Sequence, residues 1–168
     1  MEAPARLVAA AATDVRLAIL ILAITGLATL GACTEPTGQL SIPAADPTVF
    51  RDRVYPILLR DCGFNTCHGS TARFFSVFGP GRARLDPDTA PYDPATPYEL
   101  AHSYTRARSM LVDPDGPGSS LLVRKPLPTS EGGAGHKGDN PWGDSVYPSI
   151  DDPSFVTIYR WATASESP

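Results

Sequence analysis

Proline restricts this chain more than any other residue type. Eighteen prolines and fourteen glycines are spread through 168 residues. Each proline fixes φ and removes a backbone N–H donor, so we expect neither long uninterrupted helices nor a regular parallel sheet. The length corresponds to one small domain. We therefore expect a loop-rich domain built from short elements.

The charge pattern argues against nucleic acid as a partner. The formal net charge is −4, and the longest basic cluster is Arg124–Lys125. Binding to phosphates requires a concentrated patch of lysine and arginine, which this sequence does not have.

The N-terminal segment has the pattern of an export signal. Residues 17–32 form an uncharged apolar run, and its last three residues with the following cysteine read Leu30-Gly31-Ala32-Cys33. Sixteen residues are typical of a secretory signal and fall short of the roughly 20 that a membrane-spanning helix needs. The four residues from Leu30 to Cys33 resemble a bacterial lipobox. An uncleaved anchor, another export signal, or a buried helix with a chance cysteine are the alternatives.

The lipobox resemblance implies a location and a domain organisation. Residues 1–32 would be a signal peptide, and Cys33 would carry the lipid anchor that holds the protein at a membrane of the cell envelope. Thr34 follows in place of aspartate, which by the sorting rule for such lipoproteins favours the outer membrane, facing the periplasm. Residues 33–45 would be a flexible tether, and residues 46–164 the folded domain.

Helical signals recur along this domain and predict a mostly α fold. Asp46-Pro47 has the pattern of a capped helix start, with a kink at Pro56 and an end at residue 59 or 60. Asp152-Pro153 similarly starts a last helix with an aromatic stripe. Between them we expect helices at residues 98–111 and 119–125, the latter with a hydroxyl cap, and loops at residues 79–97 and 131–138.

The chemically most informative motif is Cys62-x4-Cys67-His68-Gly69. An oxidising envelope leaves two neighbouring thiols either disulfide-bonded or otherwise committed. Three hypotheses follow: covalent haem attachment with His68 as an iron ligand, a Cys62–Cys67 disulfide without cofactor, and a zinc site that adds His136. The usual haem-attachment spacing is C-x-x-C-H, and the four-residue gap is a rarer variant. An adjacent Cys-His pair is awkward for tetrahedral zinc.

The order of motifs resembles the cytochrome c-like domains of exported bacterial lipoproteins. F-x-x-x-V-x-P-I-L precedes C-x4-C-H-G, and S-S-L-L-V-R-K-P, G-x-G-H-x-G and an aromatic-bearing terminal helix follow, between Phe50 and Trp161. The resemblance implies a small class I cytochrome c-like fold in which the terminal helix crosses the first one. It also implies one haem c per chain, bound by Cys62 and Cys67, with His68 as the proximal iron ligand.

The second iron ligand has three candidates. His136 lies in a loop with Gly132, Gly133, Gly135 and Gly138, a setting that lets the chain fold over the opposite face of a porphyrin. Met110, just before an Asp-Pro turn, is the second candidate, and His102 the third. Some cytochromes leave this position open.

These patterns predict electron transfer, not catalysis. The chain is one small domain without a second cofactor site, and it has no G-x-S-x-G nucleophile elbow. Its expected partners are redox proteins, together with the membrane through the lipid anchor. The alternative is a haem-free structural or binding lipoprotein whose Cys62–Cys67 disulfide fixes a loop.

Overall fold

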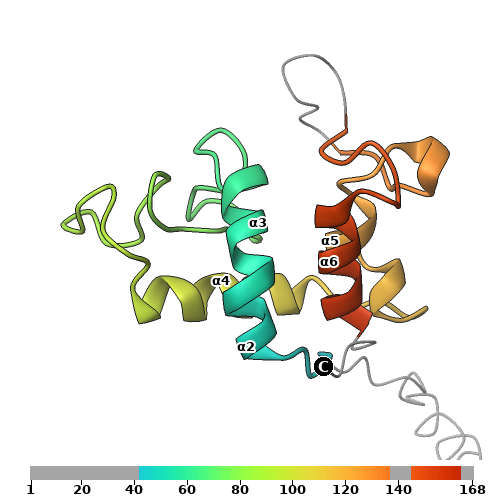
Figure 1. Cartoon of the computed structure of the whole chain (residues 1–168), viewed down its shortest axis with the longest axis horizontal. Helices are drawn as coiled ribbons and strands as arrows, with labels where there is room; N and C mark the ends of the chain where they lie inside the picture. The colour runs from blue at the N-terminus through green and yellow to red at the C-terminus, as the bar shows by residue number, and fades with distance from the viewer. Residues whose placement is uncertain (1–41, 137–144, 164–168) are drawn as a thin grey trace, which may run out of the picture. The chain divides into compact units, whose positions relative to one another are not determined.

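The computed structural model describes residues 42–136 and 145–163, and within these ranges it contains helices and no strand. The prediction of a mostly α domain is therefore confirmed. Figure 1 shows the elements: α2 (Pro47–Val49), the π-helix η1 (Phe50–Val54), α3 (Tyr55–Asp61), α4 (Pro97–Ser109), the 3-10 helix η2 (Pro117–Ser119), α5 (Leu121–Arg124), the 3-10 helix η3 (Thr129–Glu131) and α6 (Pro153–Thr163). The proposed signal peptide, Cys33 and most of the tether lie outside the described residues. None of the described helices has the length and apolarity needed to cross a membrane.

The first helical column starts where the sequence predicts. The Asp46 carboxylate accepts hydrogen bonds from the backbone N–H groups of Thr48 (2.6 Å) and Val49 (2.8 Å), and Pro47 takes the first helical position. The sequence predicts a kink at Pro56, and the structure has the wider π-helical turn of η1, which ends at Val54, two residues before this proline. A proline ring crowds the carbonyl four residues earlier in a regular α-helix, and π-turns are a common site of adjustment. The column ends at Asp61, beyond the predicted end.

The later helices follow the predictions in part. Asp152 caps α6 by accepting from the N–H groups of Ser154 (2.8 Å) and Phe155 (3.2 Å). Of the helix predicted at residues 119–125, the structure has α5 at Leu121–Arg124, and the separate 3-10 turn η2 ends at Ser119. Ser120 stands at the cap position, but its hydroxyl is buried and has no hydrogen-bond partner among the described residues, so the prediction of a hydroxyl cap is wrong.

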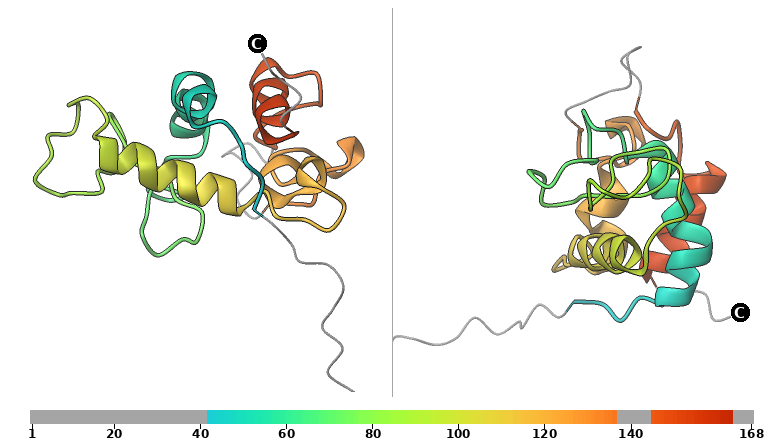
Figure 2. Two further views of the ribbon diagram at one scale, coloured as in Figure 1. Left: turned by 90° about the horizontal axis from the view of Figure 1, so that it is seen from below. Right: turned by 90° about the vertical axis from the view of Figure 1, so that its left-hand side faces the viewer.

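An aromatic cluster joins three helices into one core. The Phe50 ring of η1 lies with its centroid 5.3 Å from that of Trp161 in α6 and 5.4 Å from that of Tyr104 in α4. The polar groups of Trp161 and Tyr104 both donate hydrogen bonds to the backbone just before α2. Trp161 Nε1 donates to Asp46 O (2.9 Å), and the Tyr104 hydroxyl donates to Ala45 O (2.6 Å). Figure 2 shows α3 and α6 alongside each other, with α4 running across α3. The last helix thus packs against the first.

A buried ion pair fixes the proline-rich loop at residues 79–97. The Arg84 guanidinium donates twice to the Glu99 carboxylate, with both N···O distances 2.8 Å, and the two side chains are 5% and 1% exposed. Arg84 also donates to three backbone carbonyls of the loop, those of Ala90, Asp93 and Pro94. Glu99 completes a capping box with Thr96 at the start of α4. This pair turns a segment without regular structure into an ordered loop.

The buried Glu99 carboxylate makes the fold sensitive to acid. Burial, the largest influence, opposes its ionisation, but hydrogen bonds from Arg84 and from the N–H groups of Thr96 and Leu85 lower its pKa from 4.5 to about 2. Because the folded pKa lies below the unfolded one, this stabilisation is complete above pH 4.5 and is lost as the pH falls toward 2. We expect the urea midpoint to drop across that range, and Glu99→Gln to flatten the drop. An unchanged pH profile in the variant would contradict this role.

Candidate functional site

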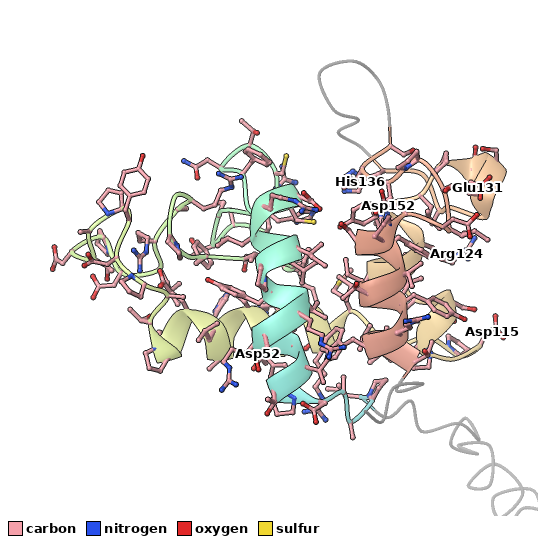
Figure 3. All side chains as sticks on the ribbon, in the orientation of Figure 1. Asp52, Asp115, Arg124, Glu131, His136 and Asp152 are labelled. Atoms are coloured by element: carbon pink, nitrogen blue, oxygen red, sulfur yellow. The ribbon has the colours of Figure 1, made fainter. Side chains whose placement is uncertain are left out.

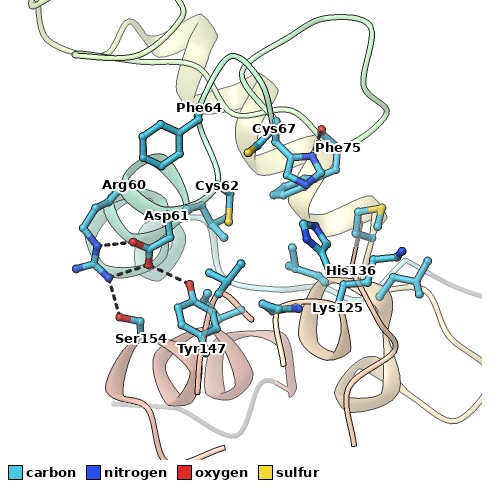
Figure 4. Close-up of a pocket in the computed structure, with 18 of the residues that line it drawn as sticks. Arg60, Asp61, Cys62, Phe64, Cys67, Phe75, Lys125, His136, Tyr147 and Ser154 are labelled. Atoms are coloured by element: carbon cyan, nitrogen blue, oxygen red, sulfur yellow. Dashed lines mark hydrogen bonds and ion pairs between the residues drawn. The ribbon is translucent and has the colours of Figure 1, made fainter. Parts of the chain in front are cut away.

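A cavity of about 800 Å³ is lined by residues of the Cys-x4-Cys-His motif and by His136. Its size falls within the range of roughly 300–1,000 Å³ that is usual for cofactor and ligand sites. It lies among the end of α3, the loop after it, α5 and the segment that leads into α6 (Figure 4). Five of the predicted site residues line it: Cys62, Cys67, His68, Met110 and His136.

The segment between the two cysteines folds into a compact turn on the end of α3. The N–H of His68 donates to Cys62 O (3.0 Å), and the N–H groups of Cys67 and Gly69 both donate to Phe64 O (2.8 Å). A Cβ at Gly69 would lie 2.5 Å from Gly63 O, so only glycine fits directly after His68. The four intervening residues are thus taken up within the turn, and both cysteines still line the cavity.

His68 is held in the form that can bind a metal ion. Its Nδ1 lies 3.0 Å from Phe75 O, which can only accept, so Nδ1 carries the proton and Nε2 keeps the lone pair. Burial is the largest influence and lowers the pKa of His68. The hydrogen bond to Phe75 raises this pKa, whereas the neighbouring charges of His136, Arg73 and Lys125 lower it further, so the net shift is downward. The imidazole is therefore neutral at pH 7, the protonation state of a metal ligand.

His136 faces His68 across a short gap. The two ring centroids are 5.9 Å apart, and the ring planes are inclined by 45°. Two imidazoles that bind one metal ion from opposite sides, with metal–nitrogen bonds of about 2 Å, have a centroid separation close to 6 Å. Figure 3 shows His136 on the side of the molecule where Asp152 precedes α6.

The glycines before His136 allow its loop to take this course. Gly132 and Gly135 have φ of 80° and 69°, values that favour glycine. A Cβ at Gly133 would lie 2.0 Å from Leu127 O. The glycine setting predicted from the sequence is therefore present up to His136, and Gly138 lies outside the described residues.

The two other candidate ligands differ in position. Met110 lines the cavity. His102 is not among the lining residues: its Nε2 lies 2.8 Å from Ser76 Oγ, and its ring packs edge-on against Phe78 at 5.3 Å. Of the three candidates, the structure thus brings His136 and Met110 to the cavity with His68.

Cys62 and Cys67 are free thiols, and they are not joined to each other in a disulfide. Within residues 42–136 and 145–163, no three histidine, cysteine, aspartate or glutamate side chains are grouped so that they could hold a metal ion. A zinc site made by Cys62, Cys67, His68 and His136 does not fit this arrangement, since structural zinc takes four protein ligands at once.

Cys62 is expected to resist alkylation in the haem-free protein. Burial, together with the negative charges of Asp61 and Cys67, raises the pKa of its thiol from 9 to about 12. The thiolate is the reactive form, so Cys62 carries roughly a thousandth of the thiolate of an ordinary cysteine. Iodoacetamide at pH 8, followed by peptide mapping, should modify Cys62 on the order of a thousandfold more slowly in the native chain than in urea. Equal rates in both conditions would show that Cys62 is accessible and ordinary.

Arg82 supports the cysteine turn, a role that no sequence motif indicated. Its Nε donates to Leu59 O (3.1 Å), and a terminal nitrogen donates to Arg60 O (2.9 Å), which satisfies two carbonyls at the end of α3. The same guanidinium lies over the Phe64 ring, 4.1 Å from its centroid. Arg82 therefore ties the turn to the helix that precedes it.

A second set of hydrogen bonds that the sequence did not reveal lies at the cavity wall, around Asp61. Arg60 Nε donates to Asp61 Oδ1 (2.6 Å), and the Tyr147 hydroxyl donates to Asp61 Oδ2 (3.2 Å). Arg60 also donates to Ser154 Oγ in α6 (2.9 Å). These bonds link the end of α3 to the segment around α6, across a sequence distance that local patterns do not report.

Comparison of the chain with protein-family models, with curated proteins and with solved structures finds no match.

Proposed function

We propose that this protein is a lipid-anchored c-type cytochrome that carries one haem and transfers one electron at a time. In this proposal the domain is a variant of the class I cytochrome c-like fold, with Cys62 and Cys67 as attachment residues. His68 and His136 are the axial ligands. Cys33 carries the lipid that holds the protein in the cell envelope, at the outer membrane facing the periplasm, and redox proteins are its partners.

The pairing of His68 with His136 supports this proposal most strongly. The two imidazoles come from loops 68 residues apart in sequence, yet their centroids are 5.9 Å apart at one cavity. His68 keeps its Nε2 lone pair because Nδ1 is bonded to Phe75 O.

The cysteines have the chemical form that haem attachment requires. Thioether formation adds a thiol S–H across a vinyl group: sulfur bonds to one carbon, the hydrogen goes to the other, and nothing leaves. Cys62 and Cys67 are free thiols on the cavity wall, within the turn that ends in His68. The iron of the bound haem supplies the one-electron chemistry.

The apolar part of the cavity lining suits a large flat apolar group. Leu58, Phe75, Leu122 and Ile158 contribute apolar side chains to the lining, and Lys125 contributes a cation. Such an apolar lining would keep water away from the bound iron, a setting that suits a cofactor whose role is to carry an electron.

Retention of haem after denaturation tests the proposal. The full chain is produced in a bacterial periplasm together with a c-type haem-attachment system, then denatured and separated by size. We expect haem to stay with the polypeptide and to give a reduced c-type absorbance band. The double variant Cys62→Ser/Cys67→Ser should lose it. A colourless wild-type chain with a Cys62–Cys67 disulfide would instead support the haem-free structural lipoprotein.

A further inference from the structure

Asp61 is a charged residue at the cavity wall that takes no part in the proposed haem ligation. It immediately precedes Cys62 and lines the cavity. Its carboxylate accepts a hydrogen bond from the Tyr147 hydroxyl and two from the Arg60 guanidinium, at 2.6 and 2.8 Å (Figure 4). All of these groups are donors to the carboxylate, so its charge has a fixed position.

Tyr147 is well suited to this donor role. The residue is only 3% exposed, and its backbone N–H donates to Pro126 O (3.0 Å). Burial, followed by the charges of Cys62 and Asp61, raises the pKa of the Tyr147 hydroxyl. The hydroxyl therefore stays protonated and keeps donating to Asp61.

The same helical column contains a natural control for this pair. Arg51 and Asp52 are also consecutive, and their side chains form the same two bonds, at 2.6 and 3.0 Å. That pair is 55% and 54% exposed, and neither residue lines the cavity. The two pairs share their chemistry and differ in surroundings.

Burial is unequal within the cavity pair. The Arg60 side chain is 62% exposed, whereas that of Asp61 is 17% exposed. Water screens the guanidinium more than the carboxylate, so the field inside the cavity is dominated by the negative partner. The other two charged lining residues, Lys125 and Asp152, oppose each other, and Asp152 is bonded to backbone N–H groups of α6.

We propose that Asp61 is a tuning residue that lowers the reduction potential of the group bound in this cavity. This inference rests on the proposed function. When iron(III) accepts one electron from a redox protein it becomes iron(II), and the site loses one positive charge. A fixed carboxylate nearby stabilises the oxidised state more than the reduced one. Tyr147 limits the effect because its hydrogen bond withdraws part of the negative charge.

Redox titration of the haem-loaded full chain tests this proposal with three variants. We expect Asp61→Asn to move the midpoint potential to more positive values and Asp52→Asn to leave it unchanged. Tyr147→Phe should move it to more negative values, because the carboxylate stays and loses a donor. A merely structural role of Asp61 does not predict these opposite signs.

The outcomes separate this proposal from the proposed function. A wild-type chain that binds no haem would overturn both. Haem-loaded protein in which Asp61→Asn and Asp52→Asn have the same potential would overturn the tuning role alone. If Asp61→Asn does not fold, the decision falls to Tyr147→Phe, where an unchanged or more positive potential would contradict the role of Asp61.

Discussion

Arg84→Ala should destabilise the folded domain by about 3–5 kcal/mol, the usual cost of breaking a buried ion pair from one side. The substitution leaves the Glu99 carboxylate buried without its bidentate donor, since the two side chains are 5% and 1% exposed. It also removes the donor to the carbonyls of Ala90, Asp93 and Pro94. Urea unfolding followed by circular dichroism measures the loss.

Arg51→Ala provides the matched control for this variant. Arg51 pairs with Asp52 through the same bidentate contact but at an exposed site, so we expect no measurable change in the urea midpoint. The two arginines lie in the same domain and differ in burial. Similar midpoints for Arg84→Ala and Arg51→Ala would contradict the assigned role of the buried pair in ordering the proline-rich loop.

His136→Ala should convert the haem-loaded protein from six-coordinate to five-coordinate iron. The reason is that His136 faces His68 at 5.9 Å between ring centroids, the separation that opposite axial ligands need. Absorbance and electron paramagnetic resonance spectra should change from low-spin to high-spin, and added imidazole should restore the low-spin form. Covalent attachment should persist, because Cys62 and Cys67 are untouched.

Two variants control for the choice of ligand. His102→Ala should leave the spectra unchanged, since His102 is bonded to Ser76 and does not line the cavity. Met110→Ala should keep the low-spin spectrum even though Met110 lines the cavity. A low-spin spectrum in His136→Ala that becomes high-spin only in Met110→Ala would assign the second ligand to Met110.

Local features of the fold could be predicted from the sequence because their partners are neighbours in the chain. Asp46 and Asp152 cap the helices that follow them, through N–H groups two and three residues away. Ser120 also stands at a cap position, at the start of α5, but it makes no capping bond, and its hydroxyl is buried. Capping propensity is thus overridden where tertiary packing decides the side chain's direction.

The candidate site could be predicted only as far as its motif is continuous. Cys62, Cys67 and His68 form one short motif, and the glycines that flank His136 indicate a loop able to approach it. Other contacts join residues that are far apart in the chain. Arg84 and Glu99 are 15 positions apart, and Arg82 is 22 and 23 positions from its two partners in α3. Asp61 and Tyr147 are 86 positions apart. No periodicity or spacing reports such contacts, because they depend on how the loops fold back.

The mass of a single peptide tests the central claim most directly. Trypsin cleaves after Arg60 and Arg73 and so releases residues 61–73, which contain Cys62, Cys67 and His68. From protein produced with a haem-attachment system, we predict this peptide at its own mass plus that of one haem, because addition to two vinyl groups removes no atoms. A peptide lighter by two hydrogens, or an unmodified one, would contradict covalent haem at this site.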